Sequence, residues 1–450
     1  MNNAADTGVR TEHDAWGAIE VPAQALWGAQ TQRALRHFAI SSERMPGELI
    51  AAMTLIKACA ARVNADLGLL DAARAQAIVA AAEAVQAGRH ADAFPLSVWQ
   101  SGSGTQSHMN MNEVLAHLAS TEALPVHPND HVNLGQSSND VVPTAIHVAA
   151  LLACTQGLLP ALQGLRDALA DKLPALRELT KIGRTHLQLA LPLSVGDEVG
   201  AWVAQLDRAR RALDAPMREV QGLAIGGTAV GGGDNTDPAF GERVAQALAA
   251  ATGIGFRRAD NPFAAQAAHD ALLQLHAALR TLALALRKIA DDLRWLASPA
   301  LGEWRLPSNE PGSSIMPGKV NPTQCEALLM VCAQVVGNDV AIGFGSTLAQ
   351  FQMHAAKPLL ALNLLQSIRL LGDGMRSFNT HCVQGMTADP DRMAQSLSPA
   401  MLQATRLQRH VGYEVAARLY REAQAGGRPL RDLAIEQGIA TAVQFDEWTG

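Results

Sequence analysis

The segment GSSIMPGKVNPTQCEALL, residues 312 to 329, places hydroxyl groups and a lysine in a glycine-bounded loop. A nucleotide phosphate loop has four residues between its glycines and a Ser or Thr after its lysine. Here five residues separate Gly312 from Gly318, and Val320 follows Lys319. The spacing therefore disfavours nucleotide binding and leaves two other chemistries open: binding of another anion, or activation of a serine or lysine.

The loop runs into an apolar stretch that has helical spacing. Asn321 is a good N-cap, Pro322 suits the first helical position, and Gln324 stands where a capping box would place it. The free N–H groups and the dipole of a helix N-terminus favour an anion, which could be a carboxylate as well as a phosphate. Glu326 follows in the first turn of the expected helix.

Three further polar patches interrupt an otherwise apolar sequence. They are SGSGTQ with Ser103 and Thr105, QSSND with Ser137, Ser138 and Asn139, and GRTH with Thr185 and His186. Each patch alone is typical of ordinary capping and turn chemistry. Together with the loop at 312, they combine many hydroxyl and amide donors with one lysine and one histidine. That combination suits a small substrate with several carboxylates.

Other kinds of site fit the sequence less well. His127 and His131 are four residues apart, but Pro128 and Asn129 between them favour a turn over a zinc-binding helix. GGTAVGGG differs from the dinucleotide fingerprint GxGxxG, and no strand is expected before it. We therefore expect neither a metal nor an organic cofactor.

The composition limits the possible partners and location. With 48% hydrophobic and 17% charged residues, the 450-residue chain can bury a large core. A net charge of -6 and 4% aromatic residues argue against nucleic-acid binding. Five scattered cysteines without CxxC spacing, and an acidic N-terminus, predict a cytoplasmic protein with reduced thiols. Polar residues interrupt the most apolar stretch, from Ala145, so we expect a buried helix and no membrane span.

Helical periodicity dominates, which predicts a mainly α fold. Shorter helices are expected near 48–64 and 71–87, and five long ones at 140–170, 194–222, 262–298, 322–348 and 357–379. These elements suggest three domains: a mixed, mostly helical N-terminal domain (1–133), a central long five-helix bundle (134–384) and a small helical C-terminal domain (385–450). The long helices are too apolar to face solvent all round, so self-association is expected.

The segment GSSIMPGKVNP resembles a specific signature of the fumarase/aspartase superfamily. FPLSVWQSGSGTQSHMNMNEV, HPNDHVNLGQSSNDVVPTAIH, KIGRTHLQ and GGTAVG extend the resemblance almost from end to end, and they are most similar to its iron-free, class II fumarases. The resemblance implies a homotetramer with a central twenty-helix core and four active sites, each shared by three subunits. Aspartase usually has glutamine at the position of His186, so this histidine favours a hydratase that interconverts fumarate and L-malate.

The resemblance also implies roles for individual residues. Ser313 matches the catalytic base, with a pKa lowered by loop amides, the helix start and Lys319. His186, oriented by Glu326, matches the group that handles the hydroxyl or water. The implied substrate-binding set is Ser103, Gly104, Thr105, Ser137, Ser138, Asn139, Thr185, Ser314, Lys319, Val320 and Asn321. A second, non-catalytic dicarboxylate site is implied at His127, Pro128, Asn129 and Asp130.

Several positions depart from the usual fumarase pattern. Leu189 and Leu191 replace polar residues beside His186, Leu134 replaces a lysine, and His108 stands where asparagine is normal. A Gly-Pro-Arg stretch is shortened to SPALGEW, and the chain stops soon after FDEW. Drift or repacking is the simpler interpretation. A substituted fumarate such as mesaconate, an aspartate-like substrate, or a non-catalytic scaffold remain alternatives.

Overall fold

The structure is a computed structural model that describes residues 8–312, 314–397 and 399–449. It is mainly helical, as predicted, and divides into two compact units. Unit 1 comprises Met1–Gln163, Arg208–Arg287 and Leu328–Arg376, and unit 2 comprises Gly164–Asp207, Lys288–Ala327 and Ser377–Gly450. Because several helices pass from one unit to the other, the domains expected at 1–133, 134–384 and 385–450 stay a prediction.

The first part of unit 1 joins a hairpin to four helices. The hairpin pairs β1 (Val9–Asp14) with β2 (Gly17–Pro22), and the helices are α1 (Ala29–His37), α2 (Gly47–Asp66), α3 (Ala72–Gln86) and α4 (Thr105–Ala119). The helices predicted near 48–64 and 71–87 are confirmed as α2 and α3. The hairpin was missed because VRTEHD in β1 has no apolar face, and none of its side chains is buried.

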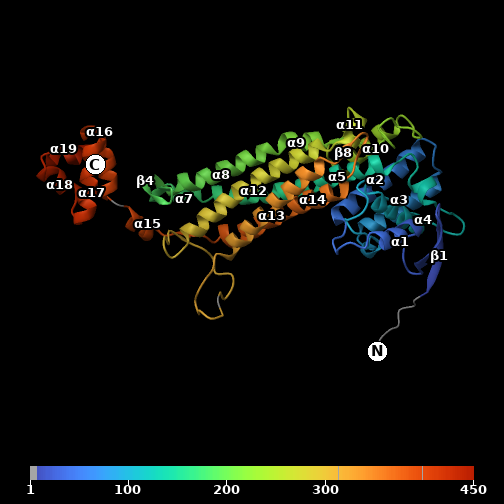
Figure 1. The fold of residues 1–450 in the computed structure, drawn as a ribbon, viewed down its shortest axis with the longest axis horizontal. Coiled ribbons are helices and arrows are strands. Elements are labelled where there is room, and N and C mark those ends of the chain that lie inside the picture. The colour runs from blue at the N-terminus through green and yellow to red at the C-terminus, as the bar shows by residue number, and fades with distance from the viewer. Residues whose placement is uncertain (1–7, 313, 398, 450) are drawn as a thin grey trace. The chain divides into compact units, whose positions relative to one another are not determined.

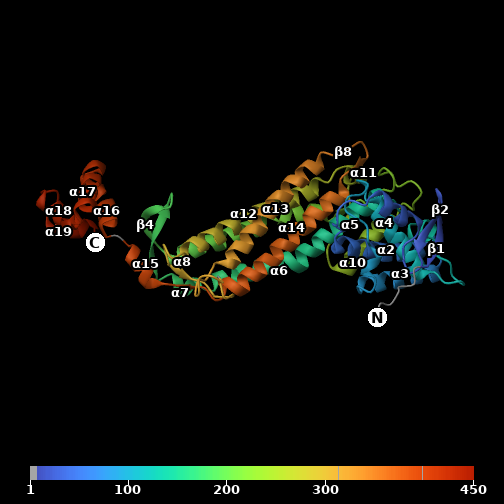
Figure 2. The same cartoon turned by 60° about the horizontal axis from the view of Figure 1, so that its bottom comes forward.

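The long helices follow the predicted ranges closely, and Figures 1 and 2 show α12, α13 and α14 running alongside one another within unit 1. The first long helix consists of α5 (Ser138–Ala153), a π-helical segment (Cys154–Leu158) and α6 (Leu159–Ala170). The others are α8 (Val195–Ala212) with α9 (Asp214–Val220), α12 (Asp270–Leu296), α13 (Thr323–Ser346) and α14 (Lys357–Phe378), which continues as a π-helical segment (Asn379–Val383).

The single helix predicted at 262–298 is wrong, because the structure divides this range into two helices. The range 262–298 contains two helices, α11 (Pro262–Ala267) and α12, separated at Ala268 and His269. Ala268 is extended, with φ -129° and ψ 149°, and the carbonyl of His269 accepts hydrogen bonds from Leu272 and Leu273. No Gly or Pro marks this break, so the sequence carried no signal for it.

The remaining elements are short. In unit 1 they are η1 (Ala91–Ala93), η2 (Pro128–Val132), α10 (Phe240–Thr252), β5 (Gly222–Leu223) paired with β6 (Arg257–Arg258), and β8 (Ala349–Gln350) paired with β9 (Met353–His354). In unit 2 they are α7 (Leu173–Leu176), α15 (Pro390–Ser396), and β7 (Trp304–Arg305) paired with β10 (Thr387–Ala388).

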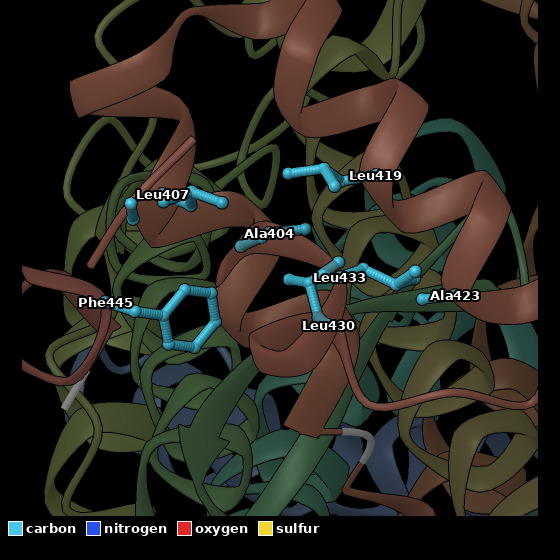
Figure 3. Close-up of a cluster of buried hydrophobic side chains, with 9 residues drawn as sticks. Ala404, Leu407, Leu419, Ala423, Leu430, Leu433 and Phe445 are labelled. Carbon is cyan, nitrogen blue, oxygen red and sulfur yellow. The ribbon is translucent and has the colours of Figure 1, made fainter. Parts of the chain in front are cut away.

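Unit 2 also contains a hairpin and a helical C-terminal part. The hairpin pairs β3 (Thr180–Thr185) with β4 (Gln188–Ser194), where the sequence had suggested only a break between helices. The C-terminal helices are α16 (Pro399–Val411), α17 (Tyr413–Gly426), α18 (Leu430–Glu436) and α19 (Ala442–Thr449). Figure 3 shows their shared core, in which Leu407, Leu419, Leu430 and Phe445 are fully buried.

Two helical stretches are long and apolar enough to cross a membrane by length and composition. In Ser138–Leu176, 61% of the most apolar window is buried inside the protein, as the sequence predicted for this stretch. In Thr323–Leu348 the buried share is only 28%. Met330, Val340 and Phe344 of α13 are exposed, and Phe344 shows 75% of its surface. Such an exposed apolar face is typical of an interface between subunits.

Candidate functional site

Two helix starts bring the first group of predicted residues together in unit 1. We call it the hydroxyl cluster, and it consists of Ser103, Gly104 and Thr105 at the start of α4 with Ser137, Ser138 and Asn139 at the start of α5. Gly104 is the N-cap of α4 and has a left-handed backbone, with φ +75°. A Cβ atom at Gly104 would lie 3.0 Å from Val142 in α5, so the absence of a side chain lets the two helix starts meet.

The α4 side of the cluster is a chain of hydroxyl groups. Ser101 Oγ lies 3.0 Å from Ser103 Oγ, which lies 2.7 Å from Thr105 Oγ1. Gly102 fixes the loop, because a Cβ atom there would lie 1.7 Å from the carbonyl oxygen of Ala355. These hydroxyl groups are half-buried and remain accessible to a ligand.

The α5 side is held by a buried carboxylate. Ser137 caps the helix, and its own N–H donates to Asp140 Oδ1 at 3.0 Å. Asp140 Oδ2 accepts from the N–H groups of Gly226 and Thr228 at 3.1 and 2.9 Å, which ties down the GGTAVG segment. Burial raises the pKa of Asp140 to about 6, against the opposing effect of these N–H donors and of Lys57.

Two buried lysines lie behind the hydroxyl cluster, and sequence analysis did not select either. Lys57 Nζ contacts His108 Nε2 at 2.7 Å, and His108 Nδ1 lies 2.9 Å from Ser138 Oγ. Lys357 follows the strand β9, and its N–H donates to the carbonyl of Gly102. Burial lowers the pKa of Lys57 well below its usual range and that of Lys357 to about 8, while Asp140 opposes both shifts. The only sequence signal was a lysine inside an apolar helical run.

Thr185 and His186 lie at the tip of the β3–β4 hairpin in unit 2. His186 and Leu187 form its two-residue turn, with φ of 55° and 60°. Such turns favour Asn and Gly, because side chains with a larger Cβ substituent are strained at positive φ. At this turn the His186 side chain is exposed. Leu189 of β4, one of the departures from the fumarase pattern, is also exposed.

A buried ion-pair network anchors this hairpin. Lys181 Nζ contacts Glu198 at 2.8 Å and Glu303 at 2.7 Å, and Arg184 contacts the other oxygen of Glu303 at 2.6 Å. Glu303 and Lys181 are almost fully buried. Glu303 belongs to the shortened SPALGEW segment, so that segment supports the strand that carries the predicted site residues.

The loop at 312 is exposed and folds back on itself. The backbone of Gly312, with φ +76°, packs so closely on Lys319 that a Cβ atom would lie 1.7 Å from the Lys319 carbonyl oxygen. Ser314, Lys319 and Val320 are exposed, whereas Ser313, the predicted base, lies outside the described residues. Lys319, Val320, Asn321 and Glu326 line a cavity of about 860 Å³ together with Arg294.

The predicted capping box at this helix start is wrong. Helix α13 begins at Thr323, and the first helical hydrogen bond runs from Glu326 N–H to the carbonyl of Pro322. Gln324 Oε1 accepts from Ser377 Oγ at 2.8 Å, so it is engaged by another helix. The helix start itself, one residue from the predicted position, is confirmed.

The pairing predicted between His186 and Glu326 is not made within one chain. Among the described residues, no hydrogen bond or ion pair joins them, and both side chains are exposed. The pairing of the two side chains stays a prediction.

The residues of the predicted second dicarboxylate site form one exposed helical turn in unit 1. Pro128 and Asn129 begin the π-helical segment η2, and His127 caps it by accepting from the N–H of Asp130. His127 Nδ1 also lies 3.1 Å from the carboxylate of Asp130. The expected turn is thus a helical one, and His127 already has Asp130 as a partner.

Comparisons with known proteins cover nearly the whole chain. Residues 17–337 match the lyase family, and residues 404–450 match the family described as the fumarase C C-terminus. The chain is 54% identical to a class II fumarate hydratase from Chromobacterium violaceum, covering 98% of each, and 53% identical to one from Nitrosomonas europaea, covering 98% of this chain and 97% of the relative. The crystal structure of a class II fumarase from Schistosoma mansoni superimposes with a TM-score of 0.95 at 39% identity, covering 98% of each chain.

Proposed function

This chain belongs to the fumarase/aspartase family of lyases and, within it, to the class II fumarate hydratases, and from that premise we propose that it catalyses the reversible hydration of fumarate to L-malate. The observation that carries the proposal is the hydroxyl cluster with Lys57 and Lys357 buried behind it. Half-buried hydroxyl donors with buried lysines behind them suit a dicarboxylate that must be bound in water.

The reaction needs a base for a weakly acidic proton next to a carboxylate. In our proposal Ser313 is that base, and the resulting aci-carboxylate is stabilised by Lys319, Asn321 and Thr185. Removing one fixed donor of this kind typically costs on the order of 10²–10³ in rate. His186, oriented by Glu326, handles the hydroxyl group that leaves malate or the water that attacks fumarate.

The hydroxyl cluster binds the other carboxylate and the reacting water. Ser103, Thr105, Ser138 and Asn139 provide its polar side chains, with Gly104, Ser137, Ser314 and Val320 shaping the two loops. Asn139 Nδ2 donates to the carbonyl of Ala229 at 2.8 Å, which leaves its amide oxygen as an acceptor. That oxygen accepts a hydrogen bond from the water, while the hydroxyl groups donate to the carboxylate.

We also propose that the active protein is a homotetramer whose sites combine segments of different subunits. Support comes from the exposed apolar side chains of α13 and from the lack, among the described residues, of a hydrogen bond or ion pair between the exposed side chains of His186 and Glu326. Light scattering should give the mass of four chains. A sharper test mixes two inactive variants, His186→Ala and Ser313→Ala, under conditions that exchange subunits. Activity returns on mixing if these residues meet across an interface, and stays absent if each chain builds its own site.

The function is tested with a substrate panel. Loss or gain of the ultraviolet absorbance of the conjugated diacid is followed with fumarate, L-malate, mesaconate and L-aspartate. We expect turnover of fumarate and malate, and a loss of about 10²–10⁴ in rate for Ser313→Ala. Turnover of mesaconate or aspartate without fumarate would overturn the proposal. No turnover of any diacid by either wild type or Ser313→Ala would mean that the chain is a non-catalytic homologue.

The exposed leucines of β4 are the one observation that favours a substituted fumarate. Leu189 and Leu191 replace polar residues beside His186, and about half of each side chain is exposed in the single chain. If they face the substrate, they offer apolar contact to a methyl group, worth about 1 to 3 kcal/mol. The variant Leu189→Asp with Leu191→Thr separates the two substrates, because it should weaken turnover of mesaconate relative to fumarate.

A further inference from the structure

A continuous line of hydrogen bonds connects the interior of unit 1 to the hydroxyl cluster. It begins at Lys57 Nζ, passes through both ring nitrogens of His108, and ends at Ser138 Oγ, with steps of 2.7 and 2.9 Å. Lys57 and His108 show none of their surface to solvent, whereas Ser138 is half-buried at the start of α5. The line therefore leads from a water-free interior to a group that a ligand can reach.

The other partners of Lys57 determine which groups donate. Besides His108, Nζ contacts Asn133 Oδ1 at 3.1 Å and Gln136 Oε1 at 2.9 Å. Asn133 Nδ2 donates to the backbone carbonyl of Gln136, and Gln136 Nε2 donates to the backbone carbonyl of Val132. The amide oxygens of both side chains therefore face the lysine. Three acceptors around Nζ match the three N–H bonds of an ammonium group.

The same assignment fixes the histidine and the serine. With Lys57 as an ammonium group, which has no lone pair, His108 Nε2 accepts from it and the ring proton resides on Nδ1. Nδ1–H donates to Ser138 Oγ, which uses one acceptor site of the hydroxyl and leaves its hydrogen free. Desolvation and the neighbouring Lys57 both lower the pKa of His108, in agreement with a neutral ring.

We propose that His108 is a positioning residue that holds the Ser138 hydroxyl as a hydrogen-bond donor toward a carboxylate of the substrate. The proposal rests on the proposed function, because it assigns a task to a site that would bind a dicarboxylate. Without this partner, nothing fixes the rotation of the hydroxyl, and the carboxylate loses a donor that is held in place. A hydrogen bond to a charged group contributes about 1.5 to 3 kcal/mol, which is about 10- to 100-fold in binding.

Substitutions at position 108 separate this role from simple packing. In asparagine, Nδ2 is as many bonds from Cα as Nδ1 is in histidine, so His108→Asn keeps the N–H that faces Ser138. His108→Ala removes it. We expect His108→Ala to raise KM for fumarate about tenfold or more with a small change in kcat, and His108→Asn to stay within about threefold of wild type.

Two controls show whether the effect passes through Ser138. In a Ser138→Ala background, His108→Ala should cause no further rise in KM, because its partner is already absent. His276 is another of the buried histidines in unit 1, and it is hydrogen-bonded to Asp339 and Ser367. His276→Asn should lower the unfolding temperature without raising KM. This control shows whether the loss of a buried histidine is by itself enough to raise KM.

A direct measurement on the wild-type protein does not depend on any variant folding. Neutron diffraction from a deuterated crystal should show deuterium on His108 Nδ1, none on Nε2, and the Ser138 O–D directed away from the imidazole. Deuterium on Nε2 alone, an unchanged KM in His108→Ala, or His108→Asn as impaired as His108→Ala would each overturn the proposal. A wild type that hydrates no diacid would overturn the proposed function instead, and the neutron result would still decide the hydrogen-bond assignment.

Discussion

Acidification should destabilise this protein through His147, a buried histidine of α5. Its Nδ1–H donates to the carbonyl oxygens of Val220 and Gly222 at 2.9 and 2.8 Å. Burial lowers the pKa of His147 from 6.5 to about 4, and the two carbonyls only partly oppose this shift. The folded protein therefore prefers the neutral ring, whereas the unfolded chain titrates near the usual value.

The sign and size of the effect follow from that difference. Because the folded pKa is depressed, the stabilising contribution is complete above the unfolded pKa of about 6.5 and is lost as the pH falls toward about 4. One pKa unit corresponds to about 1.4 kcal/mol, so the complete loss is roughly 3 kcal/mol. Between pH 7 and pH 5 the linkage relation gives a loss of about 2 kcal/mol from this residue.

The assay compares urea unfolding at these two pH values, at one protein concentration, for wild type and His147→Asn. Asparagine keeps an N–H donor toward the two carbonyls but does not titrate. The variant is expected to be less stable at pH 7 because it leaves a cavity, yet to lose about 2 kcal/mol less than wild type on acidification. All other titrating groups cancel in this comparison. Equal losses for the two proteins would refute the assignment of a buried, neutral His147.

Two further predictions concern buried charge and buried thiols. Glu303→Gln should lower the free energy of unfolding by about 3 to 5 kcal/mol, because Lys181 and Arg184 lose a buried counter-charge. Glu198→Gln, at the more exposed end of the network, should lower it by less. Equal losses for the two variants in urea unfolding would contradict this account. The five cysteines are buried, and burial raises the pKa of the Cys154 thiol to about 12. A thiol reagent should therefore label none of them in the native protein and five after denaturation, and labelling of the native protein would show that the burial is incomplete.

Periodic apolar sequence made the long helices predictable, and its absence explains what was missed. The β3–β4 hairpin has a turn made of His186 and Leu187, without the Asn or Gly that usually mark such turns. Pro192 in β4 also argues against a strand, although it is tolerated on the edge of a two-stranded sheet. His269, at the break between α11 and α12, is buried, and no neighbouring residue in the sequence indicates the break.

The loops of the candidate site could be predicted because their sequence motifs are specific. The side chains that hold those loops in place could not be predicted. His108 is 51 residues from Lys57 and 30 from Ser138. Such partners come together only after α2, α4 and α5 pack, so the spacing of residues along the chain cannot reveal them. The sequence singled out His108 as a departure from a family pattern, and only the fold supplied its partners.

The charge inside unit 1 gives a physical reason for this site to bind an anion. Asp140 is a buried carboxylate that interacts with two buried lysines, Lys57 and Lys357, and its charge opposes the lowering of their pKa by burial. Burial disfavours the charged form of each lysine, and a further negative group nearby would favour it. A carboxylate bound at the hydroxyl cluster would be such a group, whereas the side chains of the cluster are neutral. The buried lysines therefore favour a dianionic substrate, and His108 connects Lys57 to the Ser138 hydroxyl that the substrate meets in our proposal.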